Sequence, residues 1–482
     1  MRLVVGVDLG TQSCKAVVCD EQLRVLGDHQ ISHATAYPRP GWAEQDPRVW
    51  EAALAPAIGQ ALAAANAKPG DVVGLALAGQ LDGCIAVDAN SEPLYPALIW
   101  QDKRATELPA DRARLFELTG QVADASHLAA KARWLRAAGI AATTWHQPTS
   151  YLLARLTGAK FLDHAHASTT MLYDLAACAW SPELLAAFAI DPATLPAIAS
   201  TTAIAGELHA AGSLLTGLPI GTRVAVGTGD DFATPLGAGI AGPGYAICAV
   251  GTAEVVGGLS TTVVFDRPAP PRETILETHA YPTGAFFIEN PGWMSGGAVR
   301  WATRLLGLSS DAELDALAAT APAGADGITF IPALAGAMTP MWRAAARGTL
   351  HGLAASHDRS HIARAVLEGL AYASREVIER LAELGLATDQ VLVLGGGGKS
   401  AVWNQIRADV LGRLHQVAAR SDTCAIGAAM IAAVATGILP DLAAAACRAS
   451  PLAKTFTPAA ASSDDTGYER YQRLVRQIAP LW

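Results

Sequence analysis

Two adjacent carboxylates, Asp230 and Asp231, follow the apolar run 224–226 and a glycine turn. A carboxylate at the end of a buried strand can project from the sheet and accept a proton from a hydroxyl group. This makes Asp230 a candidate general base for a transfer reaction on an alcohol. The alternative is that one of the two carboxylates caps the following helix through backbone N–H groups near Ala233 or Thr234.

A second chemical feature is a pattern that occurs twice, near residue 10 and near residue 251. In each copy an apolar run, a Gly-Thr turn and another apolar run predict a β-hairpin, over 3–19 and over 246–256. Glycine lets the backbone approach an anion closely, and the N–H groups of the turn can point at it. The repeat indicates a duplicated fold that holds a polyphosphate with two turns.

A third feature is the glycine run 395–398, which follows the apolar run 391–394 and precedes an expected helix from Ala401. Strand, glycine turn and helix N-terminus together can form a platform for a nucleotide, because only glycine lets a flat purine or a ribose lie against the backbone. Taken alone, the run is equally compatible with a flexible turn.

The elements that must position these groups alternate between strands and helices, which is typical of an α/β protein. One helix is expected to begin at Asp46-Pro47 and to be kinked or broken at Pro56. Another is expected to run from about His361 to Leu384, and segment 425–439 to form a buried core helix. Strands are expected at 3–8, 14–19, 72–78, 84–87, 224–227, 246–250, 286–289 and 391–394.

Composition narrows the class of protein. With 482 residues the chain is too long for a single core, and 51% apolar with 16% charged residues is typical of a globular protein. The net charge of −9 argues against a nucleic-acid surface. The sequence starts directly with an expected strand, so we expect no signal peptide, no membrane span and a cytoplasmic location. The seven cysteines lie in apolar runs without CxxC pairs and are expected to be reduced core residues.

The sequence resembles the FGGY family of carbohydrate kinases, and within it the xylulokinases. Besides the two hairpins, the similar stretches occur in the family order and span nearly the whole chain: 41–47 (GWAEQDP), 79–83 (GQLDG), 100–104 (WQDKR), 229–231 (GDD), 364–369 (RAVLEG) and 395–398 (GGGG). The resemblance implies an actin-like ATPase fold of two ribonuclease-H-like domains with a cleft between them. The expected domains are 1–244, with the sugar site, the first hairpin and the catalytic aspartate, and 245–482, with the second hairpin and the adenosine site.

The resemblance also implies site residues. It implies Asp230 as the catalytic base, Asp8 as the residue that orients Mg²⁺, and ATP as the phosphoryl donor. Asp8 also suits a turn, and Lys15 also suits a solvent-facing strand position. The implied nucleotide-binding residues are Thr11, Gln12, Ser13, Lys15, Gly251, Thr252, Gly396, Gly397 and Ala401. The implied sugar-binding residues are Gln80, Leu81, Asp82, Asp102, Asp230 and Asp231, although GQLDG would also suit a simple polar turn.

The sequence departs from the xylulokinase pattern on the sugar side. Asp82 stands where histidine is usual, and Gln101 and Asp231 stand where asparagine is usual. Near Ala337-Met338 a Glu-Arg pair is usual, which this sequence lacks. An imidazole can donate a hydrogen bond, whereas an ionised carboxylate only accepts, so the hydroxyl groups recognised should differ.

The function implied is ATP-dependent phosphorylation of the terminal hydroxyl of a pentulose, D-xylulose first, by a homodimer. D-Ribulose, L-xylulose and erythritol remain alternative substrates. Two other classes remain open: an actin-like ATPase without a sugar substrate, and a catalytically silent sugar-binding regulator. Sugar-independent nucleotide turnover would favour the ATPase, and binding without turnover the regulator.

Overall fold

The computed structural model describes residues 2–449, 452–459 and 465–482, which form two compact units. The first unit holds the residues up to Ala241 together with Thr278–Phe286 and Asp422–Ala449. The second holds Gly242–Glu277, Phe287–Ser421 and the described residues from Leu452 onward. Chain segments far apart in sequence therefore complete the first unit.

The first unit is built on a mixed sheet whose central strands are almost completely buried. Strand order is β13-β14-β5-β1-β2-β3, and β15 also pairs with β5. The strands are β1 (Leu3–Leu9), β2 (Ser13–Cys19), β3 (Val25–Ser32), β5 (Val72–Gly79), β13 (Ile204–Glu207), β14 (Arg223–Ala225) and β15 (Thr228–Gly229). Four short pairs accompany this sheet: β4 (Glu44–Gln45) with β7 (Ala97–Leu98), β6 (Ile85–Val87) with β8 (Thr144–His146), β9 (Phe161–Asp163) with β12 (Ala197–Ala199), and β10 (Tyr173–Asp174) with β11 (Ala179–Trp180).

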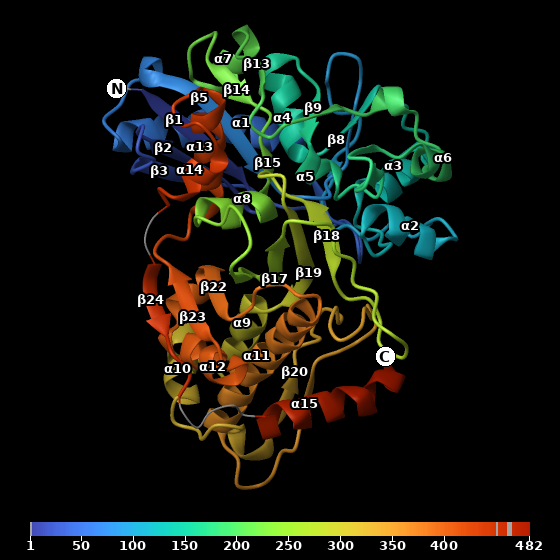
Figure 1. Cartoon of the computed structure of the whole chain (residues 1–482), viewed down its shortest axis with the longest axis vertical. Helices are drawn as coiled ribbons and strands as arrows, with labels where there is room; N and C mark the ends of the chain where they lie inside the picture. Colours follow the sequence, from blue (N-terminus) through green and yellow to red (C-terminus); the bar gives the residue numbers. More distant parts are fainter. Residues whose placement is uncertain (1, 450–451, 460–464) are drawn as a thin grey trace. The chain divides into compact units, whose positions relative to one another are not determined.

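Helices cover both faces of this sheet, with α1 (Pro47–Ala64) on one face and α13 (Thr423–Ala435) on the other. The other helices of the unit are α2 (Arg112–Thr119), α3 (Leu128–Ala137), α4 (Pro148–Thr157), α5 (His164–Ala167), α6 (Pro182–Phe188), α7 (Ala210–Thr216), α8 (Asp230–Gly237) and α14 (Leu442–Ala446). Val5 and Val7 of β1 pack in the core with α1, whereas Gly6 faces α13. A Cβ atom at Gly6 would lie 2.0 Å from the Ala425 carbonyl oxygen, so α13 can approach the sheet only over glycine. Figure 1 shows α13, from late in the sequence, against the blue N-terminal strands.

The second unit contains a sheet in which β19-β17-β16-β22-β23-β24 are adjacent in that order. Its strands are β16 (Ala246–Val250), β17 (Ala253–Ser260), β19 (Phe286–Met294), β22 (Gln390–Gly395), β23 (Leu414–Ala418) and β24 (Leu452–Phe456). Strand β18 (Glu277–Ala280) lies where the chain passes into the first unit. Strands β20 (Thr329–Ile331) and β21 (Thr349–His351) form a separate pair. Its helices are α9 (Gly296–Leu305), α10 (Asp311–Ala318), α11 (Arg359–Glu383), α12 (Ala401–Leu411) and α15 (Asp465–Ile478).

Both predicted hairpins are confirmed. β1 and β2 pair antiparallel from Leu9↔Cys14, and β16 and β17 pair antiparallel from Val250↔Glu254. In each unit the first hairpin strand also pairs in parallel with a strand that ends near glycine, β5 or β22. The two units therefore repeat one local topology, as the duplicated sequence pattern predicts.

Several sequence-based expectations are corrected. α1 runs without a break through Pro56, because Pro56 and Ala52, whose carbonyl loses its partner there, both lie on the exposed side of the helix. The expected strand 224–227 is interrupted at residues 226–227, where Gly227 has a φ of 78°. Two of the free cysteines, Cys178 and Cys447, are exposed rather than core residues.

Segment 425–439 lies mainly in α13, whose residues 423–433 are buried as predicted. No helix in the described part of the chain combines the length and the hydropathy needed to cross a bilayer.

Candidate active site

Asp230 and Asp231 form the first turn of α8, and Gly229 occupies the N-cap position. Neither carboxylate is therefore the N-cap residue, and Gly229 has no side chain that could cap the helix. The Asp230 carboxylate instead accepts a hydrogen bond from the Asp231 backbone N–H at 3.1 Å. α8 is held against α13 by a close crossing, in which a Cβ atom at Gly427 would lie 2.1 Å from the Ala233 carbonyl oxygen.

The carboxyl groups of the first unit influence one another. Burial raises the pKa of Asp230 well above its ordinary value, and the charges of Asp231 and Asp8 raise it further. Burial raises the pKa of Asp231 to about 6, with His279 opposing and Asp82 adding to the shift. Burial also raises the pKa of Asp8 to about 6, against a hydrogen bond from Cys424 and the charge of Lys15. The structure therefore places four predicted site carboxylates, those of Asp8, Asp82, Asp230 and Asp231, close enough for their charges to shift one another's pKa values.

A group of three or more metal-ligating side chains is absent within residues 2–449, 452–459 and 465–482. Mg²⁺ does not require one, because it commonly binds through one or two carboxylates together with water and phosphate oxygens. Burial raises the pKa values of Asp8 and Asp230, and Lys15 only partly offsets the shift at Asp8, so a cation bound beside them would favour their ionised forms. These two carboxylates fit the kind of site that Mg²⁺ uses.

The turn of the first hairpin is held by a hydrogen-bonded network centred on Gln45. The Gln45 amide donates to the Thr11 carbonyl oxygen at 2.6 Å, and its oxygen accepts from Gln80 at 2.9 Å and from Trp50 at 3.0 Å. Trp100 donates its indole N–H to the Thr11 hydroxyl at 2.8 Å. The predicted phosphate-binding turn and the predicted sugar-binding residue Gln80 are thus linked through one buried amide.

Lys15 lies on β2, one strand from Asp8, and is partly exposed. Its Nζ atom lies 3.9 Å from Asp28 and 3.8 Å from Asp422. The side chain is therefore not simply solvent-facing. Gln12 and Ser13 lie beside it in the hairpin turn and at the start of β2.

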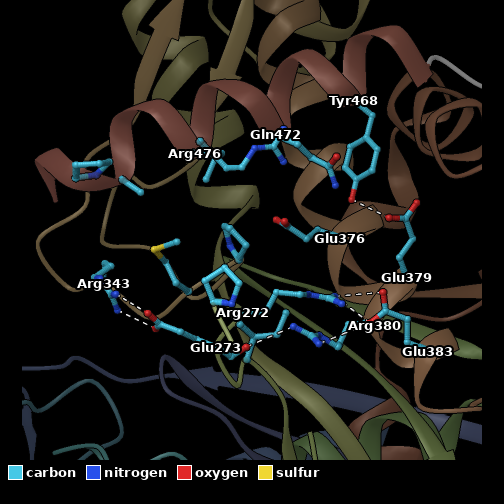
Figure 2. A pocket seen from close by; sticks show the side chains of 17 residues that line it. Arg272, Glu273, Arg343, Glu376, Glu379, Arg380, Glu383, Tyr468, Gln472 and Arg476 are labelled. Atoms are coloured by element: carbon cyan, nitrogen blue, oxygen red, sulfur yellow. Dashed lines mark hydrogen bonds and ion pairs between the residues drawn. The ribbon is translucent and has the colours of Figure 1, made fainter. Parts of the chain in front are cut away.

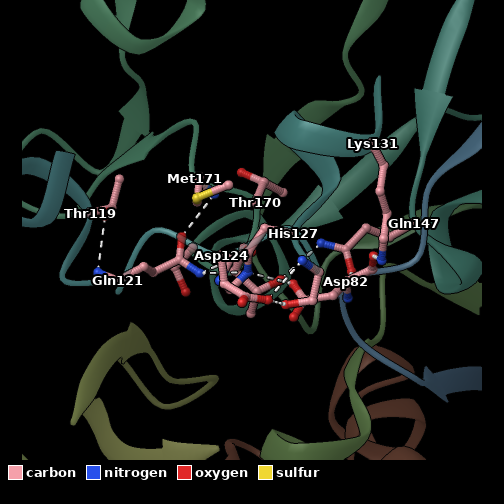
Figure 3. Close-up of polar contacts among 12 residues, drawn as sticks. Asp82, Thr119, Gln121, Asp124, His127, Lys131, Gln147, Thr170 and Met171 are labelled. Carbon is pink, nitrogen blue, oxygen red and sulfur yellow. Dashed lines mark hydrogen bonds and ion pairs between the residues drawn. The ribbon is translucent and has the colours of Figure 1, made fainter. Parts of the chain in front are cut away.

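Asp82 lies at the centre of a polar cluster that the sequence did not reveal (Figure 3). Its carboxylate oxygen is 3.1 Å from Nδ1 of His127, and its backbone N–H donates to Gln147 at 3.0 Å. Its φ of 59° lies in the left-handed region, which aspartate tolerates better than most residues. Although burial acts to raise it, the pKa of Asp82 is lowered by His127, Lys131 and His279. Asp82 is thus held as an anion.

Lys131 supports this cluster from α3. The side chain is completely buried, and its Nζ atom donates to the carbonyl oxygens of Asp82 and Ile99 at 2.7 Å each. Burial lowers the Lys131 pKa to about 8, against the favourable charges of Asp82, Cys84 and Asp102. Lys131 therefore ties the GQLDG turn to the segment that leads into WQDKR.

Asp102 is buried and bonded by protein groups on both oxygens. Arg104 donates to the carboxylate through Nε at 2.9 Å and through Nη2 at 2.6 Å, and the Ala43 backbone N–H donates at 2.7 Å. The Arg104 guanidinium lies 3.5 Å from the centre of the Trp42 ring and also donates to Glu44. Asp102 thus orders the GWAEQDP and WQDKR stretches relative to each other.

The remaining predicted sugar-side positions are also placed. Gln80 is 1% exposed, and Leu81 is buried beside it. Among the departures, Gln101 accepts a hydrogen bond from Tyr37 at 2.9 Å. Segment 337–338 lies in the second unit, where Ala337 exchanges backbone hydrogen bonds with Arg343.

In the second unit, the Gly251–Thr252 turn lies beside the N-terminus of α9. The backbone N–H groups of Ser295 and Gly297 donate to the Thr252 carbonyl oxygen at 3.1 and 3.0 Å. Arg300 of α9 donates to the Thr252 hydroxyl at 3.0 Å and is otherwise exposed. Arg300 therefore adds a cation to a turn that is expected to bind phosphate.

The glycine run packs on the same hairpin. A Cβ atom at Gly397 would lie 2.6 Å from the Val250 side chain, and Gly395 has a φ of 77°. Asn404 donates to the Gly397 carbonyl oxygen at 2.9 Å. Gly396 and Ala401 are exposed beside this packed backbone. The run is therefore a turn that packs against the second hairpin at Gly397 and leads into α12.

Sequence reasoning missed several residues that shape the site. Gln45 and Arg104 lie inside the stretches that carry the resemblance, so their positions offered a signal. Contacts across long sequence separations join Lys131 and His127 to Asp82 and Arg300 to Thr252. The same holds for Arg407 of α12, which donates to Glu254 of β17 at 2.7 Å. Nothing in the local sequence marks these four residues.

Known proteins resemble this chain along most of its length. The N-terminal domain of the FGGY family of carbohydrate kinases matches residues 3–237, and the C-terminal domain of that family matches residues 246–436. A glycerol kinase of Alkalilimnicola ehrlichii is 34% identical over 462 residues, 91% of each chain. A xylulose kinase of Klebsiella pneumoniae is 30% identical over 442 residues, 90% of each chain.

A solved structure shows the same fold. The xylulose kinase of Rhodospirillum rubrum superimposes with a TM-score of 0.89 at 29% identity, over 100% of this chain and 99% of that one. The predicted α/β fold, a two-domain architecture of the actin-like ATPase class, is confirmed.

Proposed function

This chain belongs to the FGGY family of carbohydrate kinases, and we propose that it transfers the γ-phosphoryl group of ATP to the terminal hydroxyl of a pentulose. Carbohydrate kinase activity follows from the family. The preferred substrate proposed is D-xylulose, giving D-xylulose 5-phosphate. The observation that carries the proposal is the placement of Asp230 at the start of α8, electrostatically coupled to Asp8 and Asp231.

In the proposed reaction Asp230 is the general base. Its raised pKa makes the carboxylate a better proton acceptor than an ordinary aspartate. The carboxylate takes the proton of the terminal hydroxyl as that oxygen bonds to the γ-phosphorus. The bond between the γ-phosphorus and the β–γ bridging oxygen breaks, and ADP leaves with the electron pair.

The nucleotide is proposed to bind through backbone groups. The turn that contains Thr11, Gln12 and Ser13 offers N–H groups to phosphate, and so does the Gly251–Thr252 turn. The exposed surface at Gly396 and Ala401 is proposed to receive the adenosine. Mg²⁺, when bound near Asp8, neutralises phosphate charge.

The sugar is proposed to bind at the cluster of Gln80, Asp82 and Asp231, with Leu81 as an apolar contact. Carboxylate oxygens can accept hydrogen bonds from hydroxyl groups, and a closed polar site rejects substrates that leave these groups unpaired. In this proposal Asp102 acts by positioning Arg104 and Trp42. D-Ribulose, L-xylulose and erythritol offer similar hydroxyl donors and belong in the same test.

Glycerol is a second candidate substrate, because a glycerol kinase is among the relatives with more than 30% identity. Sugar-stimulated ADP release should be measured with D-xylulose, D-ribulose, L-xylulose, erythritol and glycerol at equal concentration. The proposal predicts the highest kcat/KM with D-xylulose. A higher value with glycerol would replace the proposed substrate, and ADP release that no acceptor stimulates would instead indicate an ATPase.

The role of Asp230 is tested by Asp230→Asn, which keeps the shape but removes the base. Turnover should fall by about 10²–10⁴-fold. The thermal midpoint should not fall, because the substitution removes a buried charge. Asp389→Asn, at an exposed position of the other unit, is the matched control and should keep full activity. An Asp230→Asn variant with near-normal turnover would refute the assignment.

The proposed homodimer needs its own measurement. Sedimentation equilibrium should give twice the 49.8 kDa chain mass, and a mass of one chain would reject it.

A further inference from the structure

A cavity of about 680 Å³ lies within the second unit, among helix α11, helix α15 and the loops near residues 271 and 340. Small-molecule sites typically occupy cavities of roughly 300–1,000 Å³ with mostly apolar walls and a few polar groups. None of the residues predicted to bind nucleotide or sugar lines this cavity. It therefore requires a separate explanation.

Most charged groups of the lining already neutralise one another (Figure 2). Arg343 binds Glu273 through two hydrogen bonds of 3.0 and 2.6 Å. Arg272 lies 2.9 Å from Glu383, which Arg380 also approaches at 3.6 Å. These contacts leave the three arginines little capacity to attract a multiply charged anion.

Glu379 is likewise engaged. It accepts a hydrogen bond from the Tyr468 hydroxyl at 2.9 Å and another from Arg375 at 2.8 Å. The cavity therefore does not present a stripe of unneutralised carboxylates along α11.

Two lining groups of opposite charge, Glu376 and Arg476, form no ion pair with any described residue. Glu376 accepts one hydrogen bond from the neutral Thr339 hydroxyl at 3.2 Å, and no cation lies within 4 Å of it among the described residues. Arg476 of α15 has no ion-pair or hydrogen-bond partner in the part of the chain that the structure describes. Figure 2 shows Glu376 on α11 and Arg476 with Gln472 on α15 along the same cavity.

The environment of Glu376 disfavours its ionised form. Burial raises its pKa to about 7, with Thr339 opposing, Glu379 adding to the shift, and Arg380 and Arg272 opposing. A cationic group beside Glu376 would restore the ionised carboxylate.

Apart from Gln472, the rest of the lining is apolar. Ile275, Pro340 and Met341 contribute from the loops, and Val475 and Ala479 contribute from α15. Burial of an apolar ligand body against such walls supplies most of the affinity of small-molecule sites, while a few polar groups fix the orientation.

We propose that this cavity binds a zwitterion with an apolar body, an α-amino acid or a short peptide, whose ammonium group contacts Glu376 and whose carboxylate contacts Arg476. One unneutralised carboxylate and one unneutralised guanidinium match the single ammonium and single carboxylate of this class. A phosphate dianion fits worse, because four glutamates surround the cavity and only one guanidinium is unpaired.

Calorimetric titration of the full-length protein tests the proposal. The probes are L-phenylalanine and the dipeptide Phe-Leu, each compared with its N-acetylated form and its C-terminal amide. We expect the better of the two free zwitterions to bind about tenfold more tightly than either blocked form, because each blocked form leaves one charged side chain unpaired. Comparison of the amino acid with the dipeptide distinguishes the two sources of this chemistry.

Matched variants assign the contacts. Glu376→Gln should reduce zwitterion affinity about tenfold with little effect on the N-acetylated probe, and Arg476→Gln should do the same with little effect on the amide. Arg473→Gln, an exposed position of α15 outside the lining, should bind like the wild type. The absence of binding by both zwitterions up to 10 mM (about 2.7 kcal/mol from the 1 M standard state) would overturn the proposal. Equal affinity for free and blocked forms would overturn it as well.

Discussion

Arg407 and Glu254 form a two-pronged ion pair in the interior of the second unit, with N···O distances of 2.7 and 2.5 Å. Both side chains are at most 1% exposed, and the hydroxyl groups of Ser295 and Ser374 also donate to Glu254. Glu254 follows the Gly251–Thr252 turn, and Arg407 lies on the helix after the glycine run. The pair therefore fixes the second hairpin relative to α12.

Removal of one partner should be costly, because the other charge remains buried. We expect Arg407→Met to lower the free energy of unfolding by about 3–5 kcal/mol, and the double variant with Glu254→Met to recover part of this loss. Urea unfolding measures both effects. Arg473→Met, at an exposed position, should change the value by less than about 0.5 kcal/mol. An Arg407→Met variant as stable as the wild type would contradict the positioning role.

Lys131 should give the stability of the protein a recognisable pH dependence. Its pKa is lowered in the folded state from 10.5 to about 8, so the folded protein binds the proton less tightly than the unfolded chain does. The resulting destabilisation is fully present below pH 8 and is relieved as the pH rises from 8 to about 10.5. The difference in unfolding free energy between wild type and Lys131→Met should shift in favour of the wild type across this window. A difference that stays flat from pH 8 to 10 would show that Lys131 titrates normally, and a falling one that its pKa is raised; either result would contradict the prediction.

The glycine run offers a test that separates packing from ligand contact. Gly397→Ala should lower the thermal midpoint and raise the KM for ATP about tenfold, because its Cβ would lie 2.6 Å from Val250. Gly396→Ala should leave the midpoint unchanged, since its nearest contact would be an ordinary 3.9 Å. A raised KM for ATP in Gly396→Ala would then report loss of a nucleotide contact. Unchanged KM values in both variants would exclude this turn from the nucleotide site.

The Asp82 cluster should control which acceptor is preferred. Asp82→Asn removes the charge that faces His127 and should lower kcat/KM for the acceptor about 10–100-fold, whereas the KM for ATP should not change. Asp82→His introduces the residue that the resemblance to xylulokinases leads us to expect, at a left-handed backbone position that histidine tolerates. This variant should alter the ratio of kcat/KM between D-xylulose and erythritol in steady-state assays. Ratios identical to those of the wild type would place Asp82 outside the sugar site.

The sequence predicted the features that depend on local patterns. The two hairpins follow from the alternation of apolar residues and from Gly-Thr turns. The helix expected from about His361 to Leu384 follows from helical spacing, and α11 spans Arg359–Glu383. Local rules failed at Pro56, because a proline on the exposed side of a well-packed helix loses only a hydrogen bond that water can replace. Local rules also failed at residues 226–227, where the expected strand 224–227 is interrupted between β14 and β15 by the positive φ of Gly227.

The candidate site was predictable only in part, for a related physical reason. Residues such as Asp230 and Asp82 stand in recognisable stretches, but their supporting residues come from distant segments. Lys131 reaches Asp82 from 49 positions away, and Arg407 reaches Glu254 from 153. These contacts depend on how sheets and helices assemble, and no local periodicity encodes them.

The packing of α13 over Gly6 has a consequence for biosynthesis. The helix that covers Gly6 of the earliest strand leaves the ribosome long after that strand, because α13 begins at Thr423, 417 positions (423 − 6) further along the chain. A nascent polypeptide released before that point exposes an apolar sheet face that invites aggregation. The core of the first unit therefore cannot be completed until α13 has been synthesised.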